Sequence, residues 1–138
     1  MTSSRVDAPI TMRLPFSASA VSVARQRLKT WMTDHGERQE AVEDARLVIS
    51  ELVANAVRHA RPLSDGSILV SWATYGDGVR LSVTDGGGQT RPHSVHAPLS
   101  AVTGRGMEIV DVLSRRWWTE QTSSRSTVHA LLEDGRAI

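Results

Sequence analysis

The N-terminal part of the chain begins with an alternation of apolar and polar side chains. Three apolar residues alternate with two polar ones between Ile10 and Leu14. Because successive side chains of a strand point to opposite faces, this period of two predicts a β-strand, which Pro15 ends. Residues 1–8 precede it as a short polar tail, and we expect residues 9–138 to form a single domain.

The next segment changes to helical spacing. Apolar residues recur every three or four positions between Val21 and Met32, which predicts an amphipathic helix. We expect Ser17 or Ser19 to cap its N-terminus, because serine side chains accept hydrogen bonds from the first turn. Gly36 follows the last apolar position and is the expected end of this helix.

A longer apolar stripe predicts a second helix, from about Arg38 to Ala60. The stripe extends from Val42 to Ala56 at helical spacing. Pro62 and the turn-forming residues after it cannot continue a helix, so we expect the helix to end just before them.

Strand patterns dominate the second half of the chain. Ser67–Tyr75 and Val79–Asp85 are separated by the turn Gly76–Gly78, which predicts an antiparallel hairpin. Residues 86–103 show little periodicity and are long for a plain connection, so we interpret them as a functional loop or lid. One short helix and two closing strands are expected after it: Met107 to about Leu113, Trp117–Gln121 and Thr127–Leu132.

This order of elements predicts an α+β fold. We expect a two-layer sandwich in which three helices cover one face of a mostly antiparallel sheet of about five strands. The length of 138 residues and the hydrophobic content of 40% suit one globular domain and exclude a disordered chain. The absence of cysteine excludes a disulfide scaffold and is compatible with a reducing compartment.

Charge and hydropathy argue against two classes of binding partner, nucleic acids and membranes. The net charge of +1 lacks the basic excess of a nucleic-acid-binding protein. No apolar run approaches the ~20 residues of a membrane span. We therefore expect a cytoplasmic protein that binds neither nucleic acid nor membrane directly.

The long predicted helix carries the first candidate site. Glu51, Asn55 and His59 follow one another at intervals of four residues, so they share one helical face. Glu51 and Asn55 stand among apolar residues, and burying a carboxylate or an amide without partners is costly. A Mg²⁺ ion and a phosphate would supply such partners. The alternative is that these residues line the solvent edge of the helix.

The end of the predicted strand Val79–Asp85 carries a second candidate. Period-two alternation places Asp85 on the same face as the apolar residues of this strand. Its carboxylate could accept a hydrogen bond from an exocyclic amine such as that of adenine, and the glycines after it would let the backbone approach a flat ring. An ordinary glycine-rich turn is the alternative.

A third candidate opens the short helix. The glycines of Gly104–Gly106 can expose backbone N–H groups at a helix N-terminus, where the helix dipole favours an anion, and Arg105 adds a donor suited to phosphate. An ordinary loop is the alternative. The sequence contains no Walker-type phosphate loop, no HExxH zinc motif and no GxSxG nucleophile elbow.

Together and in this order, the three motifs resemble those of the GHKL ATPases, which share the Bergerat fold. The chain is most similar to the anti-sigma factor serine/threonine kinases of Gram-positive bacteria, and to their actinobacterial subset in particular. Asp44–Ala60 resembles the N box of these kinases, and Gly104–Val110 followed by Trp117 resembles their later glycine box. The likeness extends from about Leu14 to Leu132.

The resemblance implies roles for the residues of the first two motifs. By that resemblance Asn55 binds Mg²⁺ and so holds the phosphates of ATP, and Glu51 acts as the general base. Asp85 recognises the adenine amine and Gly87 admits the base. His59 fits the pattern of the motif, but the resemblance implies no definite role for it.

It also implies roles for the later residues. Gly104 and Gly106 give the lid room at the phosphates, Arg105 contacts the γ-phosphate or a partner, and Met107 continues this nucleotide-binding segment. Thr127 matches the position that supports the adenine site.

The implied function is that of an ATP-binding anti-sigma factor. Such a protein phosphorylates a serine of a STAS-type anti-anti-sigma factor and sequesters a sigma factor, and family members commonly form homodimers. One position departs from the family, because Gln89 replaces the last glycine of the first glycine box. This departure favours a second hypothesis, a non-catalytic ATP-dependent switch that only binds proteins. A detached histidine-kinase catalytic domain is a weaker alternative, because no helical hairpin with a phosphoacceptor histidine is present.

Overall fold

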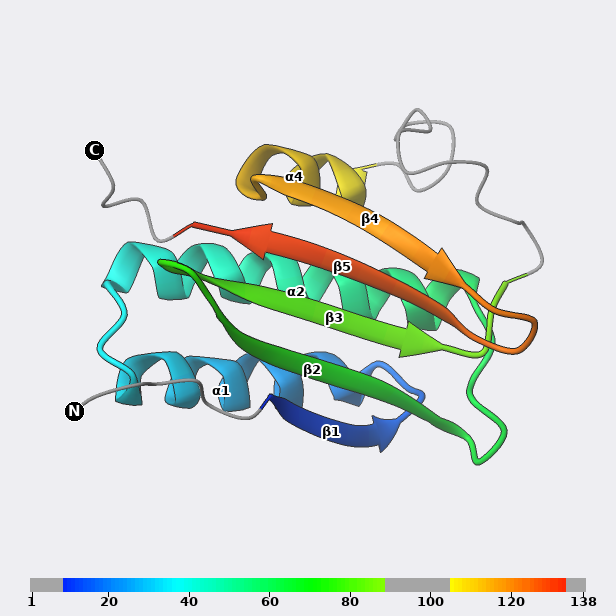
Figure 1. Ribbon diagram of the computed structural model, residues 1–138. Coiled ribbons are helices and arrows are strands. Elements are labelled where there is room, and N and C mark those ends of the chain that lie inside the picture. Colours follow the sequence, from blue (N-terminus) through cyan, green and yellow to red (C-terminus); the bar gives the residue numbers. More distant parts are fainter. Residues whose placement is uncertain (1–8, 89–104, 134–138) are drawn as a thin grey trace.

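The protein is built from two layers, a sheet and a layer of helices that covers one of its faces (Figure 1). The computed structural model describes residues 9–88 and 105–133. Its elements are β1 (Ile10–Pro15), α1 (Ser19–Asp34), α2 (Gln39–His59), β2 (Ser67–Tyr75), β3 (Gly78–Asp85), α4 (Arg105–Leu113), β4 (Arg116–Gln121) and β5 (Ser126–Leu132). The predicted α+β sandwich is confirmed, and the helices and strands begin and end within one or two residues of the predicted positions.

The sheet has five strands in the order β1-β2-β3-β5-β4, and every neighbouring pair is antiparallel. The predicted hairpin forms between β2 and β3, where Tyr75 pairs with Gly78. The last strand, β5, lies between β3 and β4, so the strand next to it in sequence becomes an edge of the sheet. Because β5 is beside β3, the start of β5 and the end of β3 lie at the same end of the sheet.

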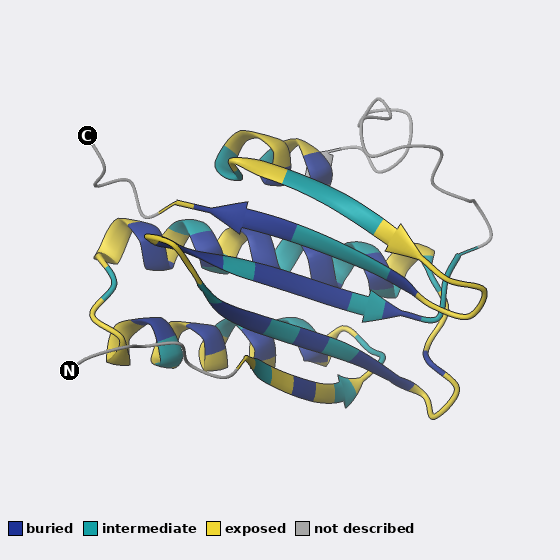
Figure 2. Ribbon diagram, viewed as in Figure 1, coloured by how far each residue is buried: buried dark blue, intermediate teal, exposed yellow. Residues whose placement is uncertain are grey.

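The hydrophobic core lies between the sheet and the helices (Figure 2). Helix α2 packs between α1 and α4, and its apolar stripe faces the sheet. In β2 the alternate residues Ile68, Val70 and Trp72 are almost fully buried against the helices. Full burial of such a side chain stabilises a fold by roughly 1.5–3 kcal/mol, so this stripe fixes the sheet on α2.

The predicted serine cap of the first helix is wrong. The N-cap residue of α1 is Ala18, and no side chain makes a capping hydrogen bond there. The hydroxyl groups of Ser17 and Ser19 lie 2.8 Å apart and bond to each other, while the backbone N–H of Ala20 donates to the carbonyl oxygen of Ser17. The serine side chains are therefore engaged with each other, and a backbone turn begins the helix.

Within residues 9–88 and 105–133 no helix covers the second face of the sheet, and polar alternate residues of the strands point to this face. Within the ranges 9–88 and 105–133, no helix is both long and apolar enough to cross a membrane. The polar tail 1–8 and most of the predicted lid lie outside the described residues.

Candidate functional site

The end of α2 and the end of β3 are joined by backbone hydrogen bonds. The N–H of Arg61 donates to the carbonyl oxygen of Gly87 at 2.8 Å, and the N–H of Gly86 donates to that of Arg61 at 2.8 Å. An isolated antiparallel bridge between Ala60 and Gly88 extends this pairing. The segment after the long helix therefore holds the glycine turn, and two of the candidate motifs meet at one end of the molecule.

Asp85 ends β3 with a buried carboxylate. Its side chain lies on the helix-facing side of the sheet, as the alternation predicted, and only 6% of the residue is exposed. The N–H of Gly87 donates to its Oδ1 at 2.7 Å. Burial raises the pKa of Asp85 to about 6, and the Gly87 hydrogen bond offsets this only in part. A carboxylate has about four acceptor positions, so Asp85 can accept a further hydrogen bond from a ligand.

The turn after Asp85 requires glycine at two positions. Gly87 has a φ of +93°, which side chains rarely allow. A Cβ on Gly86 would lie 2.1 Å from the carbonyl oxygen of Pro62, so only glycine fits against the segment after α2. A Cβ on Gly87 would meet no described atom within 4 Å. The turn is thus closed on the side of Gly86 and open on the side of Gly87.

Asn55 presents an unpaired acceptor on α2. The residue is half-buried, and its Oδ1 is buried without a hydrogen-bond partner in the described part of the chain. An unsatisfied buried polar group costs about 1–3 kcal/mol, so a ligand or cation is expected to satisfy this oxygen.

The amide oxygen of Asn55 suits Mg²⁺ better than it suits a metal ion that is bound by protein side chains alone. The described residues contain no group of three or more His, Asp or Glu side chains that could hold a metal ion. Mg²⁺ commonly takes only one or two protein oxygens and completes its shell with phosphates and water. A single orphaned amide oxygen is a suitable ligand of that kind.

Glu51 lies one helical turn before Asn55 on the same face of α2. Its side chain is half-buried, and no hydrogen bond or ion pair engages it within residues 9–88 and 105–133. The carboxylate is therefore available to accept a proton or a hydrogen bond. His59, the last residue of α2, is exposed.

The structure does not bring Thr127 to the side of Asp85. Thr127 pairs with Thr84 in the register of β3 and β5, and their Oγ1 atoms lie 2.8 Å apart. Because Thr84 precedes Asp85, both threonines point to the opposite face of the sheet. Ser126 pairs with Asp85, shares its face and is 9% exposed.

Ser126 is therefore the β5 residue that shares a face with Asp85, and the sequence did not single it out. The signal was present, because alternation back from the core residues Leu132 and Ala130 places position 126 on the buried face.

The residues of the third motif are only partly described. Arg105 and Gly106 are the first residues of α4, and Gly104 lies outside the described residues. Figure 1 shows α4 beginning on the side of the molecule where α2 ends. Met107 is 4% exposed and belongs to the hydrophobic core, so it fixes the start of α4 through apolar packing.

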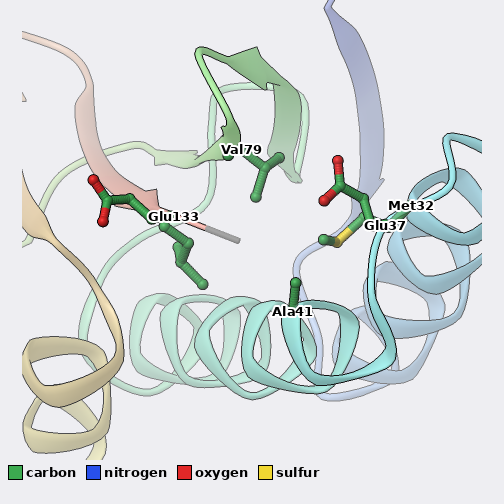
Figure 3. A pocket seen from close by; sticks show the side chains of 7 residues that line it. Met32, Glu37, Ala41, Val79 and Glu133 are labelled. Carbon is green, nitrogen blue, oxygen red and sulfur yellow. The ribbon is translucent and has the colours of Figure 1, made fainter. Parts of the chain in front are cut away.

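A separate hollow lies at the opposite end of the sheet (Figure 3). It is bordered by Met32, Ala41, Val79 and two glutamates, Glu37 and Glu133. It leaves essentially no room even for a water-sized molecule, so it is too small to be a small-molecule site. None of the candidate residues lines it, so the candidate site is the Asp85 end of the sheet.

Comparisons with known proteins were made against families, curated relatives and solved structures. Residues 14–130 match the model of the histidine kinase-like ATPase domain. Serine-protein kinase RsbW of Listeria monocytogenes is 31% identical over 116 residues, which cover 75% of this chain and 74% of the relative. Serine-protein kinase RsbW of Staphylococcus epidermidis is 34% identical over 80 residues, which cover 56% of this chain and 50% of the relative.

Two solved structures share the fold. The structure of the RsbU and RsbW domains of Rv1364c from Mycobacterium tuberculosis has a TM-score of 0.71 at 25% identity, and the match covers 92% of this chain but 32% of that one. The SiaB–SiaC complex from Pseudomonas aeruginosa has a TM-score of 0.67 at 12% identity, covering 89% of this chain and 88% of that one. The matched family model spans most of the chain, and the chain therefore belongs to the family of histidine kinase-like ATPase domains.

Proposed function

We propose that this chain is an ATP-dependent serine/threonine protein kinase that acts as an anti-sigma factor. It phosphorylates a serine of a STAS-type anti-anti-sigma factor, and it also sequesters a sigma factor. The observation that carries this proposal is the unpaired, buried Oδ1 of Asn55, one helical turn from the free carboxylate of Glu51. The relatives named serine-protein kinase RsbW support the reaction class.

The purine of ATP binds at the end of β3. The Asp85 carboxylate accepts a hydrogen bond from the amino group of adenine, using acceptor positions that Gly87 leaves free. The open side of Gly87 gives the ring room to approach. Ser126, opposite Asp85 in the sheet, takes the supporting position for which Thr127 was predicted.

The phosphates lie beside α2. When bound, Mg²⁺ neutralises part of the phosphate charge, and Asn55 Oδ1 is its protein ligand. At the start of α4, where the helix dipole favours an anion, Arg105 and Gly106 hold the phosphates together with Gly104, which precedes them in sequence.

Glu51 acts on the attacking hydroxyl. Its carboxylate accepts the proton of the substrate serine as the serine oxygen bonds to the γ-phosphorus, and the bond from the γ-phosphorus to the bridging oxygen breaks so that ADP leaves. Phosphoryl transfer depends mainly on positioning and charge stabilisation, so one oriented base beside the phosphates suffices. His59, exposed at the end of α2, has no assigned step.

Two substitutions on α2 test the proposal. Asn55→Ala should remove Mg²⁺-dependent ATP binding in titration calorimetry. Glu51→Gln should keep ATP binding and lose phosphate transfer to a cognate anti-anti-sigma factor by at least about a hundredfold, in line with a lost general base. Glu43→Gln, exposed on the same helix, is the matched control. Wild-type transfer by the Glu51 variant, or unchanged ATP binding by the Asn55 variant, contradicts the proposal.

The second candidate is a non-catalytic switch in which ATP only alters partner binding. Gln89, in place of the last glycine of the first box, favours it. A cell-based assay of sigma-factor control with Glu51→Ala separates the two, because only the kinase requires the carboxylate. We place either activity in the cytoplasm and include a homodimer among the possible states.

A further inference from the structure

The sheet face opposite the helices carries an ordered group of cationic and aromatic side chains. Arg80 on β3, Leu131 on β5 and Arg116 on β4 are direct cross-strand neighbours. Trp118 and His129 form the neighbouring pair on the same face. Because the alternate residues of these strands belong to the core, all five point away from the helices. We call this group the arginine–tryptophan face.

Trp118 contacts two neighbouring side chains through its ring. The guanidinium carbon of Arg116 lies 4.6 Å from the centroid of the Trp118 ring. The ring of His129 stacks on Trp118 with centroids 5.0 Å apart and planes 25° apart. The stack fixes the indole in one pose, and a stacked guanidinium keeps its N–H edge free for a ligand.

The histidine of this stack is itself fixed by hydrogen bonds. Its Nδ1 lies 2.7 Å from Ser82 Oγ, and its Nε2 lies 3.0 Å from Glu120 Oε1. The carboxylate of Glu120 is therefore engaged with His129 rather than with an arginine. This matters because Glu120 is the acidic residue of β4 on this face.

Two further carboxylates are engaged with other arginines. Asp65 bonds to Arg13 at 2.6 Å, and Glu133 bonds to Arg115 at 2.6 Å. Neither Arg80 nor Arg116 has a carboxylate partner in the part of the chain that the structure describes. Two unpaired guanidinium groups therefore remain on one flat face, separated at Cα by two strand spacings, or roughly 10 Å.

A single apolar residue, Leu131, lies between these arginines. Leu131 is 7% exposed although it lies on the outer face of the sheet. Tryptophan and arginine are the residues most enriched in the energetic centres of protein interfaces, and an apolar centre flanked by charges is typical of them. Both arginine side chains point away from the hydrophobic core, so neither contributes to it.

We propose that the arginine–tryptophan face docks an acidic segment of a partner protein, whose carboxylates bind Arg80 and Arg116 while an apolar side chain packs on the accessible part of Trp118. Guanidinium groups bind carboxylates in bidentate fashion, which provides direction as well as charge. A second copy of the same face would oppose like charges, which disfavours self-association through it. The face lies across the sheet from Asp85, so docking there is compatible with a nucleotide at the candidate site.

The test uses the full chain and a defined probe. A short fluorescein-labelled peptide of Glu residues around a central Leu is titrated by fluorescence anisotropy, and its contact surface is mapped by amide chemical shifts. Wild type should bind it, with affinity falling as salt rises, and the shifts should centre on β3, β4 and β5. The double variant Arg80→Gln/Arg116→Gln should bind at least about tenfold more weakly. Its ATP binding should be unchanged, which separates this inference from the proposed kinase function.

The matched control changes the same charge on the other layer. Arg27→Gln/Lys29→Gln removes two exposed cations from α1 and should bind the peptide like wild type. Equal loss in both double variants means unspecific charge attraction and overturns the proposal. It is also overturned if an oligonucleotide but not the peptide maps to this face, or if the chain self-associates through Arg80 and Arg116 in sedimentation.

Discussion

Replacing the buried carboxylate at the end of β3 tests the link between stability and nucleotide recognition. The side chain of Asp85 is buried and ionised at neutral pH, with one backbone N–H from Gly87 as its described hydrogen-bond donor. The substitution Asp85→Asn keeps the size and an oxygen that can accept this bond, but removes the buried charge. We expect the variant to be more stable than wild type and poorer at binding ATP.

The magnitude follows from the pKa of Asp85. Burial raises this pKa from the ordinary value of 3.8 to about 6. At about 1.4 kcal/mol per pH unit, the ionised carboxylate lowers the free energy of unfolding by about 3 kcal/mol above pH 6. Below pH 3.8 the Asp85 carboxyl group is neutral in both the folded and the unfolded state, so it does not lower the free energy of unfolding. As pH rises from 3.8 to 6 only the unfolded state ionises, so wild-type stability falls.

Urea denaturation at a series of pH values measures this effect. At pH 7.5 Asp85→Asn should be more stable by about 2–3 kcal/mol, and the difference should vanish near pH 3.8. Asp77→Asn, in the exposed turn between β2 and β3, should show no such pH-dependent gain. ATP affinity of Asp85→Asn should fall by at least about tenfold. An Asn variant that is no more stable at pH 7.5, or a gain that persists at pH 3.8, refutes the reasoning.

Three further outcomes are expected. Wild-type affinity for ATP should fall as pH drops through about 6, because the protonated carboxyl group of Asp85 has fewer hydrogen-bond acceptor positions. Titration calorimetry at pH 5 and pH 8 measures this change. Equal affinity at the two pH values contradicts the contact between Asp85 and adenine. Ser126→Ala should weaken ATP binding several-fold while Thr127→Val leaves it unchanged, and the reverse order would place the threonine in the site. Gly86→Ala should destabilise the fold by about 1–3 kcal/mol in thermal melts followed by circular dichroism, because its Cβ would collide with the carbonyl of Pro62; an unchanged melting temperature would show that the turn relaxes freely.

Much of the candidate site could be predicted from local sequence patterns. The spacing of Glu51 and Asn55 placed both on one face of a helix, and alternation along β3 placed Asp85 on the buried side. Alternation also governs β5, where it would have favoured Ser126 over Thr127. The serine cap of α1 failed because Ser17 and Ser19 bond to each other, a pairing that residue type alone does not reveal.

The sequence by itself determined the elements, their order and the face that each residue occupies, because a period of 2 or 3.6 residues is a property of one segment. Only the tertiary structure decided that β5 lies between β3 and β4, and that Arg61 pairs with the glycine turn after Asp85. It alone aligned Arg80 with Arg116 across Leu131. These are contacts between segments distant in sequence, and their register depends on how all strands and helices pack together, which no single segment encodes.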